Sequence, residues 1–163
     1  MIKQEMNICL WYDDQAEEAV RFYTSIFADS ETGQISRFGK EGFEYHGKPE
    51  GTTMSVPFSL NGMKFIAMNG GPLFRFNESV SIVVYCETQD EIDHYWNRLS
   101  EGGTEQACGW LKDKYGLSWQ IVPSVLPGLL AAADPVKRER VLKVAFQMTR
   151  FDLATLKEGY DSN

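Results

Sequence analysis

Hydrophobic and polar residues alternate along several short stretches of this chain, and in other stretches apolar residues recur at every third or fourth position. The clearest alternation lies in Leu117–Val122, where Ser118 and Gln120 separate Trp119 and Ile121 from their apolar neighbours. Alternation with a period of two places successive side chains on opposite faces of a strand. We therefore expect Trp119 and Ile121 to pack behind a sheet, and Ser118 and Gln120 to face its other side.

One order of elements is predicted in the first half of the chain. A strand over Asn7–Tyr12 precedes a helix whose apolar stripe, spaced i, i+3, i+4 and i+7, begins at Ala19. Extended segments follow at Gln34–Phe38, Thr52–Leu60 and Met63–Met68. Asn61-Gly62 predicts a hairpin turn between the last two. The stretch Gly39–Gly51, rich in glycine and charge, predicts a long surface turn or insertion.

The second half repeats this order. A strand over Ser79–Cys86 precedes a helix whose apolar stripe begins at Ile92. Extended segments follow at Glu105–Leu111 and Leu117–Val122. The two halves align at a shift of 73 residues through strand and helix, which matches Tyr12 with Tyr85. Such a repeat predicts that the chain is built from two βαβββ modules.

Polar residues mark the starts of the predicted helices. The two repeated helices carry capping-box patterns, Asp14 with Glu17 and Thr88 with Glu91. Beyond the second module, Asp134-Pro135 predicts a helix start and Asp152 predicts the cap of a last short helix. The helix after Pro135 has apolar residues on a broad arc, which predicts packing within a core or across a dimer boundary.

These patterns predict an α+β fold of two tandem βαβββ modules with C-terminal helices. We assign the first module and its linker to residues 1–78, the second module to residues 79–124 and a C-terminal helical arm to residues 125–163. All three parts are expected to form one compact domain.

The amino-acid composition limits the kinds of partner that the protein is expected to bind. The chain has 163 residues, of which 43% are hydrophobic, enough for a substantial core. Its net charge of −7 argues against nucleic acid as the main partner. No apolar run approaches the roughly 18 residues of a membrane span. Met1–Glu5 lacks the apolar segment of a signal peptide, and the three cysteines have no close spacing. We therefore expect a cytoplasmic protein with reduced thiols.

The duplicated unit resembles the vicinal oxygen chelate superfamily, which includes glyoxalase I, extradiol dioxygenases and the fosfomycin and bleomycin resistance proteins. Several stretches resemble its PhnB-like subfamily, namely Cys9–Tyr12, Ala16–Ala19, Phe22-Tyr23, Phe65–Pro72 and Asp113–Pro123. Members are often labelled 3-demethylubiquinone-9 3-methyltransferases. The sequence gives no support to that activity, because it has no Gly-rich strand–loop–helix segment suited to S-adenosylmethionine. The resemblance implies a glyoxalase-like cupped sheet.

In metal-dependent relatives, the first and last strands of each module supply His and Glu ligands to a divalent metal. The corresponding positions in this sequence fall at or near Ile8, Ile66, Ser81 and Gln120. Divalent transition metals need imidazole, carboxylate or thiolate donors, which these positions do not provide. His46 and His94 lie outside the expected strands. We therefore predict that the usual metal site is absent and that no cofactor is bound.

The cup then remains as a pocket with apolar walls, a few hydroxyl groups and one amide. The residues expected to face it are Leu10, Tyr12, Ile66, Met68, Ser81, Tyr85, Ser118 and Gln120. Such a lining suits a small neutral or cationic ligand. The sequence therefore favours a metal-independent small-molecule binding protein that forms a homodimer. Two alternatives are a divalent-metal-dependent lyase, isomerase or dioxygenase acting on a small oxygenated substrate, and a structural dimer whose side chains fill the cup.

Other groups are interpreted as structural. Cys9 and Cys86 lie on predicted strands and are expected to be small buried thiols. Cys108 lacks a histidine placed to activate it as a nucleophile. Lys112-Asp113-Lys114 is interpreted as the ordinary charge of a turn. No catalytic residue is assigned.

Overall fold

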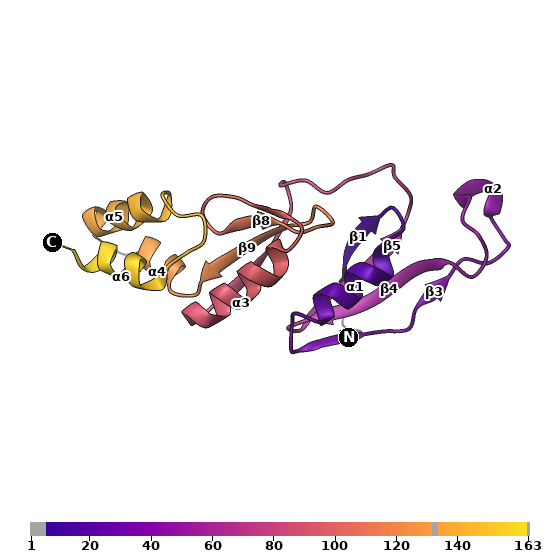
Figure 1. The fold of residues 1–163 in the computed structure, drawn as a ribbon, viewed down its shortest axis with the longest axis horizontal. Helices are drawn as coiled ribbons and strands as arrows, with labels where there is room; N and C mark the ends of the chain where they lie inside the picture. The colour runs from indigo at the N-terminus through magenta and orange to yellow at the C-terminus, as the bar shows by residue number, and fades with distance from the viewer. Residues whose placement is uncertain (1–5, 132–133, 163) are drawn as a thin grey trace, which may run out of the picture. The chain divides into compact units, whose positions relative to one another are not determined.

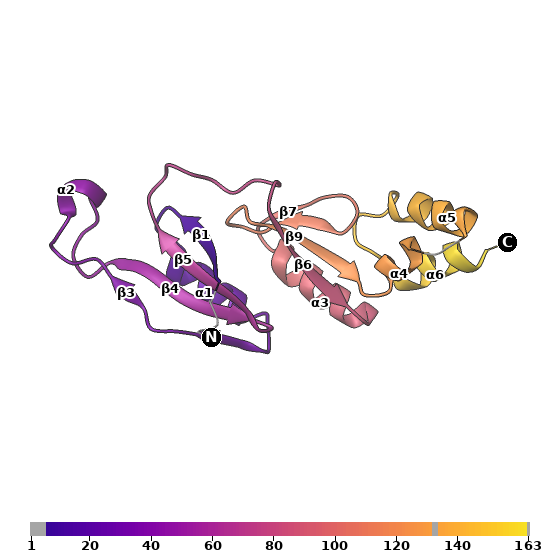
Figure 2. The same ribbon diagram turned by 180° about the vertical axis from the view of Figure 1, so that it is seen from behind.

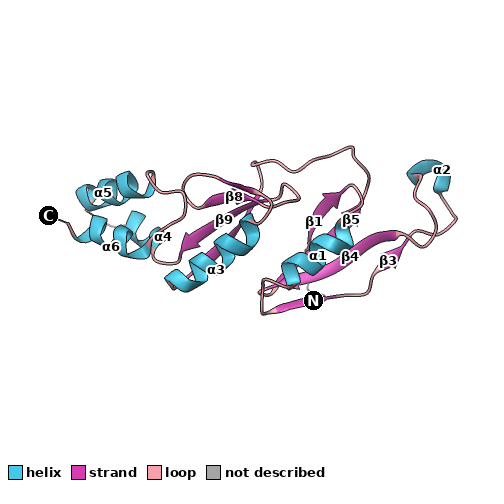
Figure 3. Ribbon diagram, viewed as in Figure 1, coloured by secondary structure: helices cyan, strands magenta, loops and turns pink. Residues whose placement is uncertain are grey.

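The computed structural model describes residues 6–131 and 134–162, and the chain divides into two compact units, Met1–Arg75 and Phe76–Asn163 (Figure 1). Each unit contains a β-sheet with a helix across one face, and the second unit ends in a group of further helices (Figure 3). This confirms the predicted α+β architecture of two βαβββ-like modules with C-terminal helices. The stretch Met1–Glu5, on which the signal-peptide prediction rests, lies outside the described residues.

The first unit contains β1 (Ile8–Tyr12), α1 (Ala16–Thr24), β2 (Ser30–Thr32), β3 (Ser36–Arg37), α2 (Phe43–His46), β4 (Thr53–Leu60) and β5 (Met63–Asn69). Its sheet has the order β1-β5-β4-β2, with β3 also paired to β4. The β1–β5 pair is parallel and the other pairs are antiparallel, so that β1 and β2, which α1 connects, run in the same direction. Asn61 and Gly62 both have positive φ, which is the geometry of the predicted hairpin turn. The predicted insertion contains the short helix α2.

The second unit contains β6 (Ser81–Cys86), α3 (Gln89–Ser100), β7 (Thr104–Glu105), β8 (Trp110–Lys112), β9 (Ser118–Pro123), α4 (Leu126–Leu130), α5 (Pro135–Ala145) and α6 (Leu153–Asp161). Its sheet has the order β6-β9-β8-β7, and β6 and β9 are again parallel. Trp119 and Ile121 are fully buried on the face that α3 covers, as the alternation predicts. Figure 2 shows both units from behind, with strands in front of α1 and α3.

The two modules differ by one residue in the loop between the first strand and the helix. The last residues of β1 and β6, Tyr12 and Cys86, are 74 positions apart, whereas the first residues of α1 and α3, Ala16 and Gln89, are 73 apart. The shift of 73 is therefore right for the helices and wrong for the first strands. Because a one-residue slip moves every side chain of a strand to the other face, it misplaces the face of β1.

The extra loop residue also changes how α1 begins. The predicted capping box of Asp14 and Glu17 is wrong, because the N-cap of α1 is Gln15, whose side chain makes no capping hydrogen bond. Instead the backbone N–H of Ala16 donates to Asn69 Oδ1 over 2.8 Å. In the second module the predicted box is confirmed, with Thr88 at the N-cap and its reciprocal bonds to Glu91 present.

Asp113 is not ordinary turn charge, as the sequence suggests, but a buried anchor of the β8–β9 hairpin. Its side chain accepts hydrogen bonds from the indole Nε1 of Trp119 at 2.8 Å and from the backbone N–H groups of Tyr115 and Leu117 at 2.9 and 3.1 Å. The residue is 3% exposed. The carboxylate thus fixes the turn and satisfies the polar atom of the largest side chain in this core.

The C-terminal arm belongs to the second unit. The backbone N–H groups of Cys108 and Gly109 donate to the carbonyl groups of Met148 and Thr149, each over 2.8 Å. Gly109 has a φ of 78°, and a Cβ there would lie 2.6 Å from the ring of Phe151, so glycine allows the arm to approach closely. Asp134 and Asp152 cap α5 and α6, as predicted. None of the helices among the described residues is long and apolar enough to cross a membrane.

Candidate functional site

The second sheet has one face that α3 leaves uncovered. The pairing of β6 with β9 sets Val83 opposite Gln120 and Tyr85 opposite Val122, and the pairing of β8 with β9 sets Trp110 opposite Gln120. Directly paired residues point to the same side of a sheet. A row of apolar side chains therefore surrounds the single amide of Gln120 on this face.

A hydrogen bond to Ser81 fixes the orientation of the Gln120 amide. Gln120 Nε2 donates to Ser81 Oγ over 2.8 Å. The carbonyl oxygen Oε1 of Gln120 accepts no hydrogen bond from the residues that the structure describes. An amide held in this way presents its acceptor rather than its donor to an incoming group.

The C-terminal arm turns this sheet face into a pocket of about 370 Å³. From the sheet side, the lining residues are Val83, Tyr85, Cys108, Trp110, Gln120 and Val122. From the arm they are Leu126, Pro127, Leu130, Leu142, Ala145, Phe146 and Phe151. No charged side chain is among them. Tyr85 and Phe146 are 61% and 69% exposed, so much apolar surface of the pocket remains in contact with solvent.

Cys108 is held in place at this pocket by contacts of both its backbone and its thiol. Its backbone has a φ of 59°, and its thiol donates to the carbonyl oxygen of Ala145 over 3.6 Å. Its own backbone N–H joins the arm to the sheet. The position of Cys108 therefore depends on the same contacts that build the pocket.

The residues that were expected to face the cup lie in different environments in the structure. In the second unit, Tyr85 and Gln120 line the pocket and Ser81 holds Gln120. Ser118 lies on the same face but is fully buried, with its hydroxyl 3.5 Å from the carbonyl oxygen of Asn77. These four lie where the alternation places them.

In the first unit the expected residues separate onto two faces. Leu10 and Tyr12 are buried toward α1, and the hydroxyl of Tyr12 lies 3.2 Å from that of Tyr23 on this helix. Ile66 and Met68 are half-buried on the other face, where β1 supplies their partners Cys9 and Trp11. Cys9 is therefore exposed and not buried, contrary to the expectation. The cause is the one-residue slip described above.

Sequence reasoning did not find Trp110, Cys108 or the residues of the arm that line the pocket. One signal was available for the arm, because the apolar residues on α5 cover more than one face of that helix. Leu142 and Phe146 form the part of this arc that borders the pocket. No pattern in the sequence indicates which neighbour that second face meets.

The residues at the positions implied for metal ligands do not fit a divalent transition metal. Ser81 and Gln120 are hydrogen-bonded to each other, and Ile8 and Ile66 offer only apolar side chains. Across residues 6–131 and 134–162, no three His, Cys, Asp or Glu side chains gather closely enough to hold a metal ion.

Comparisons with known proteins agree with this fold. The family described as 3-demethylubiquinone-9 3-methyltransferase matches residues 4–122. A PhnB protein from Bacillus cereus is 35% identical, with a TM-score of 0.65 over 74% of this chain and 100% of its own. The fosfomycin resistance protein FosX from Listeria monocytogenes shares the fold at 19% identity, with a TM-score of 0.55 over 81% of this chain and 100% of its own. No curated protein matches the chain. The chain therefore belongs to the PhnB-like family described as 3-demethylubiquinone-9 3-methyltransferase, and its fold is that of the glyoxalase and fosfomycin resistance proteins.

Proposed function

We propose that the protein is a metal-independent small-molecule binding protein whose ligand occupies the pocket on the uncovered face of the second sheet. The observation that carries this proposal is the Gln120 amide, held by Ser81 within walls that are otherwise apolar. Ligand pockets in proteins combine mainly apolar walls with a few fixed polar groups that orient the ligand. A volume of about 370 Å³ lies within the usual range for such pockets.

The lining defines the chemistry of the ligand. Trp110, Tyr85 and Phe146 favour an apolar or aromatic body, because they offer broad flat surfaces. The available Gln120 Oε1 favours a group that donates a hydrogen bond, such as an N–H, an O–H or a protonated amine. We therefore propose a small neutral or cationic ligand with an aromatic body and a donor group.

A divalent-metal lyase, isomerase or dioxygenase is less well supported, because the donors at the implied positions are an amide, a hydroxyl and two apolar side chains. A structural dimer with a filled cup is less well supported because Tyr85 and Phe146 leave large exposed surfaces at the pocket. Dimer formation and a cytoplasmic location remain parts of the proposal that rest on the sequence.

The test is a thermal-shift screen of small aromatic amines and neutral aromatic amides, followed by calorimetric titration of the hits. Gln120→Met keeps the side-chain volume and removes the acceptor, so we expect affinity to fall about tenfold, the effect of one hydrogen bond. Gln34→Met, on an exposed loop of the first unit, is the matched control and should leave affinity unchanged. The proposal is wrong if no compound stabilises the protein, or if both variants bind the hits as the natural chain does.

A further inference from the structure

A second cleft, of about 600 Å³, lies entirely within the first unit and is lined mainly by charged and polar side chains. Its lining residues are Asp14, Glu17, Arg21, Arg37, Lys48, Pro49, Thr52, Thr53 and Asn69. They come from the loop between β1 and α1, from α1, β3, β4 and β5, and from the loop after α2. Nothing in the proposed function uses this cleft.

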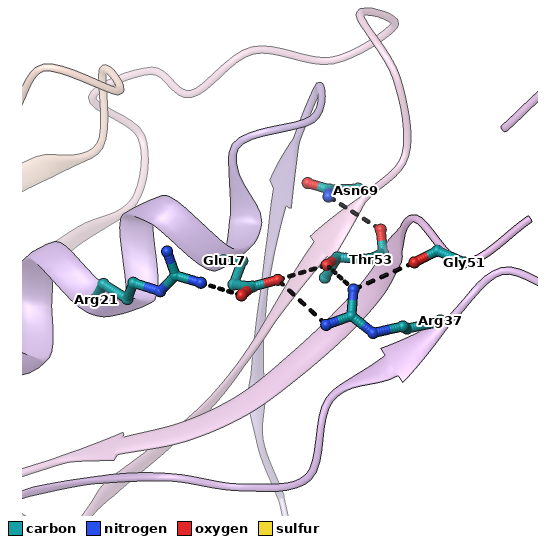
Figure 4. Close-up of polar contacts among 6 residues, drawn as sticks. All are labelled: Glu17, Arg21, Arg37, Gly51, Thr53 and Asn69. Atoms are coloured by element: carbon teal, nitrogen blue, oxygen red, sulfur yellow. Dashed lines mark hydrogen bonds and ion pairs between the residues drawn. The ribbon is translucent and has the colours of Figure 1, made fainter. Parts of the chain in front are cut away.

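The Glu17 carboxylate lies between the side chains of Arg21 and Arg37, both of which line the cleft (Figure 4). Arg21 Nη2 donates to Glu17 Oε1, and Arg37 Nη2 lies 3.8 Å from Glu17 Oε2. Thr53 Oγ1 donates to the same Oε2 over 2.7 Å. This hydrogen bond is the main cause that lowers the pKa of the Glu17 carboxyl, and the two arginine charges lower it further. The single negative charge of Glu17 thus faces the two positive charges of Arg21 and Arg37.

Arg37 is the cation of the cleft that two hydrogen bonds hold from one side. Its Nη1 donates to the carbonyl oxygen of Gly51 at 3.2 Å and to Thr53 Oγ1 at 3.1 Å, as Figure 4 shows. Its Nε makes no hydrogen bond with the residues that the structure describes, so this donor is available. A guanidinium held on one edge presents the other edge in a fixed orientation, which suits an oxyanion.

Lys48 adds a third positive charge. Its side chain is 23% exposed, and Nζ donates to the Asp13 carbonyl oxygen over 3.0 Å and lies 3.9 Å from Asp13 Oδ1. The carboxylates of Asp14 and Glu17 line the cleft and that of Asp13 lies beside Lys48, so the three cations are matched by three carboxylates there. The cleft therefore offers oriented N–H donors to an anion rather than an excess of positive charge.

We propose that this cleft binds a small anion that carries a phosphoryl or carboxylate group, with Arg37 as its main contact and Arg21 and Lys48 as supporting charges. An anion places its oxygens against donors that Glu17 leaves unused, and charge-assisted bonds to guanidinium groups are stronger than neutral ones. Arg21 and Arg37 are 75% and 49% exposed, so binding is weak and salt-dependent.

The test is a titration of the full chain, labelled with ¹⁵N, with inorganic phosphate at constant ionic strength set by sodium chloride. We expect saturable shifts of the Arg37 and Arg21 Nε–H signals. Arg37→Gln should weaken phosphate binding about tenfold or more. Arg138→Gln, an exposed arginine on α5, is the matched control and should change affinity less than twofold. A parallel titration with succinate distinguishes a carboxylate site from a phosphoryl site.

Three results overturn the proposal: chloride produces the same shifts, neither phosphate nor succinate saturates, or Arg37→Gln binds as tightly as the natural chain. If Arg37→Gln loses its folded spectrum, Arg37→Lys serves instead, because it keeps the charge and removes the fork of donors. That variant should weaken binding severalfold while its spectrum stays folded. Unchanged binding by a folded Arg37→Lys counts against the proposal.

Discussion

Replacing Asp113 by alanine removes one carboxylate that holds three hydrogen-bond donors in the second unit. The indole N–H of Trp119 loses its partner in a site where Trp119 is fully buried, and leaving such a group unpaired costs about 1–3 kcal/mol. The turn loses the acceptor for the backbone N–H groups of Tyr115 and Leu117, which adds about 1–2 kcal/mol. We therefore expect Asp113→Ala to lower the free energy of unfolding by about 2–5 kcal/mol.

Urea unfolding followed by tryptophan fluorescence and far-UV circular dichroism measures this loss. Hydrogen exchange of the β8–β9 amides locates it, because the hairpin should lose protection before the first unit does. In Asp113→Asn the side-chain amide has one acceptor oxygen and one donor nitrogen. It can accept from the turn and face the indole N–H with its own donor, or accept from the indole and lose a hydrogen bond to the turn. We therefore expect a smaller loss of unfolding free energy, about 2 kcal/mol.

Lys114→Ala is the matched control in the same turn. Lys114 is exposed, and its ammonium lies 5.2 Å from the centre of the Tyr115 ring, so its removal should cost less than about 1 kcal/mol. If Asp113→Ala is no more destabilising than Lys114→Ala, Asp113 is ordinary turn charge and the reasoning here is refuted.

Three further predictions concern other parts of the chain. Burial, with a smaller effect of a nearby glutamate, raises the pKa of Cys86 to about 12, and burial also raises the pKa of the solvent-exposed Cys9, so at pH 8 Cys86 should be alkylated more slowly than Cys9, as peptide mass spectrometry would show. Gly70→Ala places a Cβ 2.1 Å from the Trp11 ring and should cost about 1–3 kcal/mol in urea unfolding; no change would mean that the ring moves freely. Asp152→Ala removes the cap of α6 and should cost about 1 kcal/mol at pH 7. Backbone hydrogen bonds lower the pKa of Asp152 below its ordinary value of 3.8. The stability difference between the natural chain and Asp152→Ala should therefore persist above pH 3.8 and vanish as the pH falls through the lowered pKa of Asp152. A difference that stays constant when unfolding is measured across this pH range would contradict the prediction.

The parts of the fold that could be predicted depend on local patterns. Alternation in β9 gives the correct faces for Trp119 and Gln120, and the repeat gives the two modules. The face of β1 could not be predicted from the repeat, because one extra residue in the loop before α1 reverses it. Nothing in the local sequence around Leu10 or Tyr12 reveals that insertion, since both faces of β1 carry large apolar or aromatic residues.

Contacts between distant segments explain the rest. In the sequence, Asp113 looks like an ordinary charged residue of a turn. Its burial cannot be predicted locally, because it depends on Trp119, six positions later, and on the path of the turn. The walls of the pocket come from β8 and the C-terminal arm, and only the folded chain places Phe146 near Gln120. Sequence patterns thus predicted which face of the sheet carries Gln120, while the walls of the candidate pocket arise from tertiary packing.

We propose that the pocket on the uncovered face of the second sheet binds its ligand without a metal. The most direct measurement is calorimetric titration of a screening hit into chelator-treated protein whose metal content has been measured by elemental analysis. We predict the same affinity before and after the treatment, in protein that holds far less than one metal ion per chain. Binding that disappears with the metal and returns when about one Zn, Ni, Mn or Fe ion per chain is restored would contradict it.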